Sequence, residues 1–278
     1  MTINDFKAKA ISVLEHRVDN PRMEAEQLLM WALHLSHSDI IIRRRDTVPS
    51  DAEARLMGAI KRRLAREPLQ YIIGEWDFYG LRMFCGPGCL IPRSESEMLV
   101  DFAVRNLPRG GHLLDLCTGS GCIAVAVLNN RPDVTASAVD ISEDALYYAR
   151  KNAEYHGISS DSLKLFCQDI LDHSPLVIPD VIVSNPPYIK TEDVEQLQQE
   201  VLFEPYIALN GGYDGLDFYK IIASKYERFM KPTTSIAVEL GYDIAREVDA
   251  LFRGKRFQTE LLYDTHGIAR VCVAKKRP

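Results

Sequence analysis

The stretch VIVSNPPYIK, residues 181–190, joins a short apolar run to the tetrapeptide Asn-Pro-Pro-Tyr. Consecutive prolines have no N–H to donate to a β-ladder, so the apolar run is a strand that ends at Asn185. The Asn185 side chain and the backbone of Pro186 each offer a carbonyl acceptor, and Tyr188 offers a flat surface. Two acceptors can hold both hydrogens of a planar –NH2 group. We therefore expect Asn185, Pro186, Pro187 and Tyr188 to form a catalytic and substrate-binding loop.

An amide or aromatic amine is a poor nucleophile, because its nitrogen lone pair is delocalised. A loop that holds both hydrogens orients this nitrogen towards an electrophile and favours its pyramidalisation, which is catalysis by positioning. No strong general base is required, since the proton can leave after the transfer. The alternative is that Asn-Pro-Pro only ends a strand in a turn. A second motif, which predicts a ligand pocket beside the loop, favours the catalytic interpretation.

The second motif, LLDLCTGSGCIA, places Asp115 and residues 117–121 across a strand-to-helix turn. Glycines let a ligand approach the backbone, and the start of the helix offers free N–H groups. An ordinary βα turn has the same appearance when taken alone. However, Asp140 ends the next strand 19 residues after Gly121, the spacing at which an acid commonly holds a ribose diol. Asp169 ends the strand after that.

The pattern D-x-C-T-G-S-G lacks the G-x-G-x-x-G of a dinucleotide site, and its acidic opening suits a cationic amino-acid group better than a phosphate. This combination resembles the S-adenosylmethionine pocket of Rossmann-like methyltransferases. The resemblance implies that Asp140 holds the ribose hydroxyls and that the region after Asp169 borders the adenine. The expected cofactor-binding residues are Asp115, Cys117, Thr118, Gly119, Ser120, Gly121, Asp140, Ile141, Asp169, Ile170 and Asn185.

The elements that position these residues follow from the hydrophobic periodicity. Residues 1–67 have the pattern of a bundle of about four helices, whose expected starts are Thr2 with Asp5, Asn20-Pro21, and Ser50 with Glu53. Residues 71–84 suggest a β-hairpin, and Ser94 with Glu97 suggests the start of a helix. Strands then alternate with helices, which implies a doubly wound, mostly parallel sheet with ligands at its carboxyl ends. The expected strands are 112–116, 134–140, 163–169, 180–185, 235–240 and a terminal hairpin of 257–263 and 268–274.

Five segments, in order along the chain, resemble the peptide chain release factor glutamine N5-methyltransferase family (HemK or PrmC): EPLQYIIGEWDFYGL, GPGCLIPRSESE, SNPPYI, EPYIALNGGYDGLDFY and DTHGIARV. The resemblance covers about residues 67–278. It implies methyl transfer from S-adenosylmethionine to the side-chain amide nitrogen (N5) of the glutamine in the Gly-Gly-Gln motif of release factors. It also implies that IPRSESE covers the site, with Arg93 and Glu97 as further substrate-binding candidates. The implied parts are a helical substrate-binding domain (1–70), a β-hairpin linker (71–85) and a Rossmann-like α/β methyltransferase domain (86–278).

The chain departs from the family at three positions in these motifs. The family usually has Gly where Cys117 stands, and Pro and Thr where this chain has Ser94 and Ser96. We expect the cofactor to bind if Cys117 has a negative φ, and Ser94 to cap its helix. DLCTGSGC resembles a sister family that methylates a glutamine of a large-subunit ribosomal protein, which is the alternative acceptor. A nucleic acid amino methyltransferase is less favoured, because it needs a basic, aromatic-lined recognition domain.

Composition and charge limit the other function classes. The net charge of −6 argues against a dedicated duplex-DNA binder, so we expect no direct nucleic acid substrate. The first twenty residues show no targeting signal, and no apolar run approaches the roughly 18 residues of a membrane span. The six cysteines form no CxxC pair and are expected to be reduced in a cytoplasmic protein. His34 and His37 have no companion ligand at metal-binding spacing, so no metal is expected.

Overall fold

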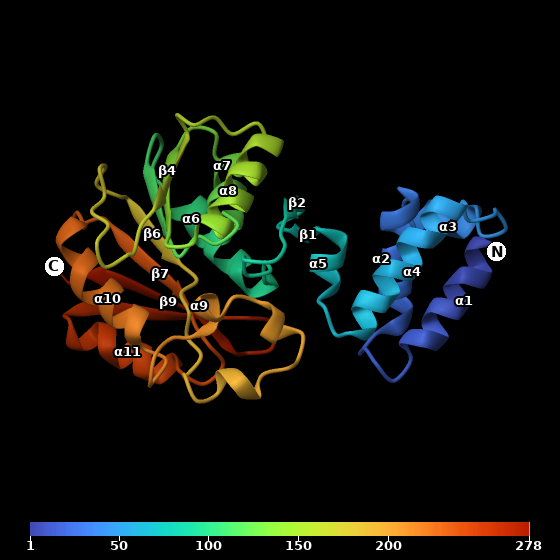
Figure 1. Ribbon diagram of the computed structural model, residues 1–278. Coiled ribbons are helices and arrows are strands. Elements are labelled where there is room, and N and C mark those ends of the chain that lie inside the picture. Colours follow the sequence, from blue (N-terminus) through green and yellow to red (C-terminus); the bar gives the residue numbers. More distant parts are fainter. Residues whose placement is uncertain (278) are drawn as a thin grey trace. The chain divides into compact units, whose positions relative to one another are not determined.

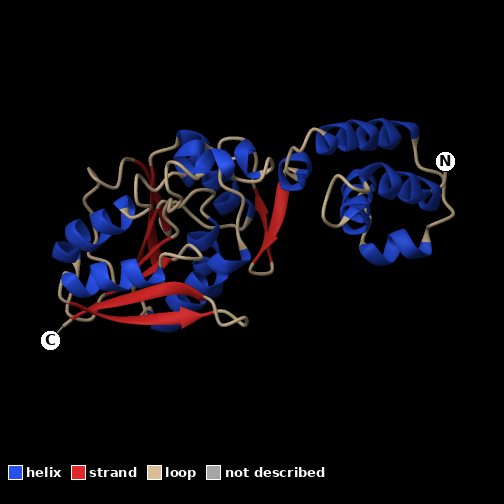
Figure 2. Cartoon of the chain, turned by 90° about the horizontal axis from the view of Figure 1, so that it is seen from below, coloured by secondary structure: helices blue, strands red, loops and turns tan. Residues whose placement is uncertain are grey.

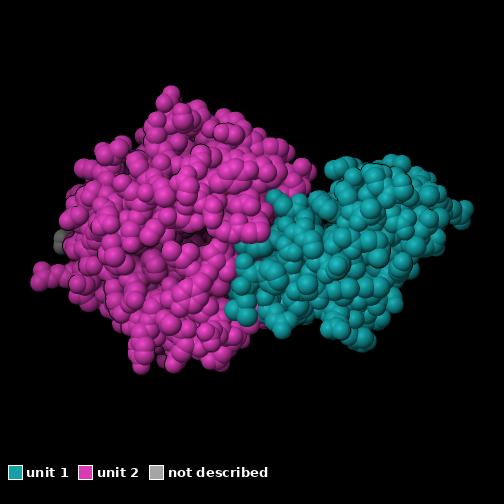
Figure 3. All heavy atoms as spheres, viewed as in Figure 1, with its two compact units in different colours: residues 1–74, 199–203 teal, residues 75–198, 204–278 magenta. Residues whose placement is uncertain are grey.

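The computed structural model describes residues 1–277, and the chain divides into two compact units. Unit 1 consists of Met1–Gly74 together with Gln199–Phe203, and unit 2 consists of Glu75–Gln198 and the residues from Glu204 onwards. Figure 3 colours the two units separately. Within residues 1–277, none of the helices combines the length and the apolar character that crossing a membrane requires.

Unit 1 is built from helices, which Figure 2 shows joined by loops. The Thr2–Asp5 capping box is confirmed, because the Thr2 hydroxyl accepts a hydrogen bond from the Asp5 N–H at 3.1 Å. The predicted cap at Ser50 is wrong. Pro49 occupies the N-cap position in an extended conformation, and its carbonyl already accepts from the Glu53 N–H at 2.8 Å. The helices are α1 (Ile3–Leu14), α2 (Pro21–Leu33), α3 (His37–Ile42), α4 (Ser50–Leu64) and α5 (Leu69–Ile73).

A buried ion pair joins α2 to α4 within unit 1. The Arg63 guanidinium donates to the Glu24 carboxylate at 2.6 Å, and the side chains of both residues are buried. The same guanidinium donates to Glu200 at 3.2 Å, and Glu200 belongs to the segment 199–203. A residue far along the chain therefore completes the charge balance of the helical unit.

Unit 2 contains a seven-stranded sheet with the order β5-β4-β3-β6-β7-β9-β8. The first five strands in this order run parallel, and the last two form the terminal antiparallel hairpin. This topology confirms the predicted mostly parallel α/β fold. The strands are β3 (His112–Leu116), β4 (Thr135–Asp140), β5 (Leu163–Cys167), β6 (Val181–Ser184), β7 (Ser235–Glu239), β8 (Phe257–Tyr263) and β9 (Ala269–Lys276).

A separate two-stranded hairpin, β1 (Glu75–Phe78) and β2 (Leu81–Phe84), opens unit 2. It is shorter than the predicted 71–84, because Leu69–Ile73 form helix α5, which ends at Gly74 in a left-handed conformation (φ 84°). The helices of unit 2 are α6 (Glu97–Asn106), α7 (Cys122–Asn130), α8 (Glu143–Tyr155), α9 (Tyr206–Leu209), α10 (Asp217–Lys225) and α11 (Ala245–Gly254), with short 3₁₀ turns η1 (Ser94–Ser96), η2 (Val194–Gln196) and η4 (Tyr226–Phe229); η3 (Val201–Phe203) lies in unit 1.

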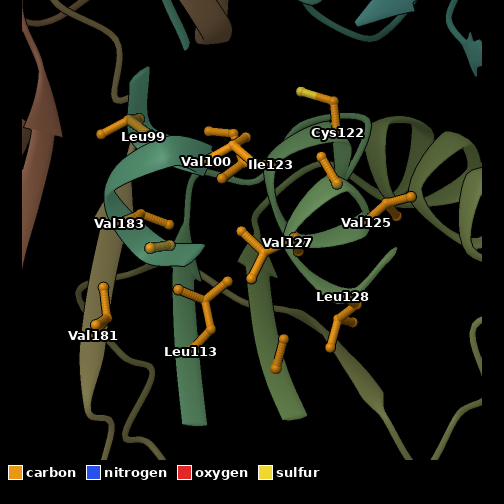
Figure 4. Packing of buried hydrophobic residues seen from close by; sticks show 14 of the residues in the cluster. Leu99, Val100, Leu113, Cys122, Ile123, Val125, Val127, Leu128, Val181 and Val183 are labelled. Atoms are coloured by element: carbon orange, nitrogen blue, oxygen red, sulfur yellow. The ribbon is translucent and has the colours of Figure 1, made fainter. Parts of the chain in front are cut away.

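Alternate residues of the strands face two separate cores. Leu113 and Val183 pack with α6 and α7 on one face, as Figure 4 shows for the residues labelled there. Leu114 and Ile182 pack with α10 and α11 on the other face. In Figure 1, α7 and α8 lie along one side of the sheet, and α10 and α11 lie along the opposite side. Both faces are covered, so ligands reach the sheet at its edge, where the strands end.

Candidate functional site

A cavity in unit 2 opens where β3, β4 and β6 end and their loops begin. Parallel strands bring these three loops to the same edge of the sheet. The predicted site residues that line the cavity are Arg93, Cys117, Thr118, Gly119, Ser120, Asp140, Ile141, Asp169, Ile170, Asn185 and Pro187. The predicted residues that lie outside this lining are Glu97, Asp115, Gly121, Pro186 and Tyr188.

The carboxylate of Asp140 is held rigidly at the end of β4. One oxygen accepts from the Gly119 N–H at 2.8 Å, and the other accepts from the Ser142 N–H at 2.9 Å. Gly119 has a φ of 56°, a conformation that glycine adopts without strain. Burial raises the pKa of Asp140, and the two N–H donors oppose that rise. The carboxylate thus faces the cavity in a fixed orientation, as binding a diol requires.

Asp115 supports the glycine turn from behind. Its side chain is fully buried, and one carboxylate oxygen accepts from the Thr118 hydroxyl at 2.6 Å. Burial raises the pKa of Asp115 to about 7. Gly121 also lies behind the cavity wall, where a Cβ would come within 3.0 Å of Ala149 on α8. These two residues shape the turn and do not contribute to the cavity surface.

Cys117 has a φ of 57°, so the condition of a negative φ, under which the cofactor was expected to bind, is not met. The chain leaves β3 through a left-handed residue, the conformation that glycine adopts most readily. A non-glycine residue in this region is uncommon and strained. Burial raises the pKa of the Cys117 thiol well above its usual range, so the thiol is neutral and adds no charge to the cavity.

The chemistry of these residues fits S-adenosylmethionine. The fixed carboxylate of Asp140 suits the ribose hydroxyls, and Ile141 and Ile170 provide apolar surface for a flat base. The backbone around Gly119 allows a ligand to approach closely, because a Cβ there would meet only Cys89 Sγ, at 4.0 Å. When bound, the cofactor supplies a methyl group on a sulfonium centre.

A chain of hydrogen bonds leads from the predicted catalytic loop into the protein. The Asn185 side-chain nitrogen donates to the Ser96 hydroxyl at 3.0 Å, and Ser96 donates to the Glu239 carboxylate. Ser96 and Glu239 are each 2% exposed, and burial raises the pKa of Glu239 to about 7. From the sequence, Ser96 stands out only as a departure from the family's usual Thr, and Glu239 carries no predicted role. Glu239 ends its strand with an acid, as Asp140 does, and this shared position is the sequence signal that could have identified it.

Three glycines surround Tyr188. A Cβ at Gly241 would lie 2.8 Å from the Tyr188 ring, and a Cβ at Gly211 or Gly215 would lie within 2.8 Å of the Tyr188 and Pro187 backbone. Burial raises the pKa of the Tyr188 hydroxyl to about 12, so the phenol stays protonated. The ring is therefore packed firmly behind the cavity wall and supports Asn185 and Pro187, which form part of that wall.

The segment 91–93 lines the cavity and is held by Glu204, which lies two residues before α9. The Glu204 carboxylate accepts from the Ile91 N–H at 2.9 Å and forms an ion pair with Arg93. Sequence reasoning missed Glu204, although it lies in the segment EPYIALN. Its partners are about 110 positions away, so no local pattern identifies them.

The helix start near residue 94 differs from the prediction. The Ser94 hydroxyl contacts Glu95 at 3.0 Å, and α6 begins only at Glu97 after a 3₁₀ turn, so the predicted Ser94 cap is wrong. Glu97 is not among the residues that line the cavity, and its carboxylate accepts from the Tyr79 N–H at 2.8 Å. Tyr79 sits in the turn of the β1–β2 hairpin with a φ of 54°. Glu97 thus stabilises the hairpin turn.

Comparisons with known proteins identify the family of the two parts of the chain. Residues 7–74 match the PrmC N-terminal domain, and residues 94–211 match the methyltransferase small domain. A protein of Geobacter sulfurreducens named release factor glutamine methyltransferase is 39% identical over 92% of this chain and 90% of its own. One of the same name from Thermodesulfovibrio yellowstonii is 35% identical over 91% and 92%. The solved structure of a methyltransferase from Pyrococcus furiosus, 16% identical, covers 83% of this chain and 100% of its own with a TM-score of 0.52, which supports the fold alone.

Proposed function

The chain belongs to the release factor glutamine methyltransferase family, and we propose that its acceptor is the glutamine side chain of the Gly-Gly-Gln motif of peptide chain release factors. The enzyme is an S-adenosylmethionine-dependent methyltransferase, and the methyl group goes to the amide nitrogen (N5). The observation that carries the proposal is the orientation of Asn185. Its side-chain nitrogen is engaged by Ser96, which leaves its carbonyl oxygen to accept a hydrogen from a substrate amide.

The residues of the catalytic loop hold the acceptor for the reaction. The Asn185 side-chain oxygen and the Pro186 carbonyl accept the two amide hydrogens, and Tyr188 supports the loop from behind. With S-adenosylmethionine bound, the loop would hold the amide nitrogen towards the methyl group that the cofactor supplies, and the proton released from the nitrogen would pass to water. Positioning of this kind supplies much of the rate enhancement when no strong base takes part. Cys117, Gly119 and Asp140 would hold the methyl donor beside the loop.

The proposal extends to the partner and its location. The helices of unit 1 would bind the release factor, and no nucleic acid serves as the substrate. A release factor acts during protein synthesis, so we place the reaction in the cytoplasm. The partner and the location follow from the identity of the acceptor, so the experiment that tests the acceptor also tests them.

Label transfer from methyl-labelled S-adenosylmethionine tests the acceptor. The samples are a purified release factor, the same factor with the glutamine of its Gly-Gly-Gln motif replaced, ribosomal subunits that lack methylation, and unmodified DNA. We expect label on the intact factor and none on the replaced factor. Label on a ribosomal protein or on DNA, with none on the release factor, would overturn the proposed acceptor.

A further inference from the structure

We propose that Ser96 and Glu239 are positioning residues that determine which end of the Asn185 carboxamide faces the substrate. This inference rests on the proposed function, in which Asn185 must present an acceptor to an amide. The carboxamide has an oxygen and an NH2 of nearly the same size, so its shape alone does not determine its orientation. In the wrong orientation, the NH2 group of Asn185 would face the NH2 group of the substrate, and no hydrogen bond could form between them.

The direction of the hydrogen-bond chain follows from its buried end. An ionised carboxylate only accepts hydrogen bonds, so the single proton of the Ser96 hydroxyl must go to Glu239. The hydroxyl oxygen can then only accept from Asn185, and this requires the Asn185 NH2 group on that side, at 3.0 Å. The Asn185 oxygen is thereby left for the substrate.

Protonation of Glu239 removes this constraint. A neutral Glu239 can donate to Ser96, and Ser96 can then donate to the Asn185 oxygen, which reverses the whole chain. Asn185 would turn its NH2 group towards the –NH2 group of the substrate, and one of the two acceptors would be lost. The charge of Glu239 therefore controls a hydrogen bond at the reacting amide without touching the substrate.

The groups around Glu239 have opposing effects on its pKa. Its side chain is buried at the end of β7, and its backbone carbonyl accepts from the Tyr219 hydroxyl at 2.7 Å. Burial and the neighbouring Glu95 favour the neutral acid, whereas the cations Arg270 and Arg93 favour the carboxylate. The titratable and charged groups that face Glu239 come from several elements: Glu95 on η1, Arg93 before η1, Cys122 on α7, Tyr188 after β6, Tyr219 on α10 and Arg270 on β9.

Steady-state kinetics with S-adenosylmethionine and a release factor test the inference on four full-length variants. Glu239→Gln keeps the shape but supplies a donor, and Ser96→Ala breaks the chain. We expect each to lower kcat by about 10- to 100-fold, with the KM for the release factor and the Kd for the cofactor within about twofold of wild type. Ser96→Thr keeps the hydroxyl and is expected to restore turnover relative to Ser96→Ala. Ser224→Ala is the matched control and should keep wild-type kinetics, because the exposed Ser224 hydroxyl donates to the Lys220 carbonyl of its own helix.

The pH profile separates positioning from a structural effect. Glu239 must be ionised, so the kcat of the wild type should rise with pH through about 7, the pKa of Glu239. In Ser96→Ala this limb should disappear from the residual activity, because Glu239 is no longer connected to Asn185. Circular dichroism checks the fold, and if Glu239→Gln fails to fold, the comparison of Ser96→Ala with Ser96→Thr decides.

Retention of near wild-type kcat in Ser96→Ala, or of the same pH limb in that variant, would overturn the inference. An equally large loss of kcat in Ser96→Thr would also overturn the inference. It would show that a change in packing at position 96, with the hydroxyl kept, is enough to lower kcat. These results differ from a failure of the proposed function, in which the wild type itself would leave the release factor unlabelled.

Discussion

The carboxylate of Glu204 accepts a hydrogen bond from the backbone N–H of Ile91 at 2.9 Å, across 113 positions of the chain. The other carboxylate oxygen pairs with Arg93. One buried side chain thus fixes both the backbone and the charge of the segment that lines the cofactor cavity. The segment 91–93 is positioned by this tertiary contact, because it lies outside the helices and strands of the fold.

Glu204→Ala should loosen that segment. The Ile91 N–H would be left buried and unpaired, which costs about 1–3 kcal/mol of unfolding free energy. We also expect weaker cofactor binding, because residues 91–93 line the cavity. Chemical denaturation and titration calorimetry measure the two effects. The exposed Glu195→Ala is the control and should stay within about 0.5 kcal/mol of wild type. Unchanged stability in Glu204→Ala would contradict the prediction.

Gly241→Ala should displace the Tyr188 ring. The new Cβ would lie 2.8 Å from a ring carbon, closer than atoms pack, so the ring and the Asn-Pro-Pro-Tyr loop must move. A displacement near 1 Å can lower a rate by about 100-fold, so we expect kcat/KM to fall by about 10- to 100-fold. The control is Gly254→Ala, where a Cβ would meet no described atom within 4 Å. Equal kcat/KM in the two variants would show that the loop tolerates the extra methyl group.

Replacements of Cys117 should show the strain of its left-handed conformation. Cys117→Gly relieves about 1–2 kcal/mol of backbone strain but loses the packing of the thiol, so the free energy of unfolding should change by less than about 1 kcal/mol. Cys117→Val adds a β-branched side chain at a φ of 57° and should lower it by about 1–3 kcal/mol. Denaturation of both variants beside wild type measures the difference. A valine variant as stable as the glycine variant would contradict the assignment of strain.

Asp115→Asn should flatten the pH dependence of stability. Burial raises the pKa of Asp115 from 3.8 in the unfolded chain to about 7 in the folded protein. The folded state therefore binds the proton more tightly, and this stabilisation is complete below pH 3.8 and is lost as the pH rises through about 7. The stability of the variant relative to wild type should rise with pH across this window. Denaturation at four pH values from 4 to about 8 tests this, and Glu239, which titrates in the same window, cancels in the difference. A difference that stays constant with pH would contradict the raised pKa.

Helix starts and strands that depend on residues close together in the sequence were predicted correctly from the sequence. The Thr2 capping box needs only Asp5 three residues later, and the strand of Val181–Ser184 needs only its apolar run and the prolines that follow. The mostly parallel sheet followed from the alternation of such elements. The same reasoning failed at two predicted helix starts. Pro49, and not Ser50, is the N-cap of α4, and a 3₁₀ turn at Ser94–Ser96 precedes α6.

The parts of the site that sequence reasoning missed depend on tertiary contacts. Ser96 differs from the family's usual Thr, but its contact with Asn185 joins residues 89 positions apart, so no local pattern reveals it. The family resemblance made Glu97 a substrate-binding candidate, whereas its carboxylate accepts a hydrogen bond from the Tyr79 N–H, 18 positions away. The backbone conformation of Cys117 was also unpredictable, since cysteine itself favours a negative φ.

The segment Gln199–Phe203 folds with the helical unit, although the chain on both sides of it belongs to the catalytic unit. The polypeptide therefore crosses between the units three times, after Gly74, after Gln198 and after Phe203. A helical domain encoded in one continuous stretch can be removed by truncation at one position, whereas unit 1 is encoded in two stretches of the chain. Truncation at Gly74 would leave Glu200 without Arg63 and would remove the helices with which residues 199–203 fold. Domain exchange between relatives must therefore carry this five-residue segment together with the first 74 residues, as a single module encoded in two separate stretches.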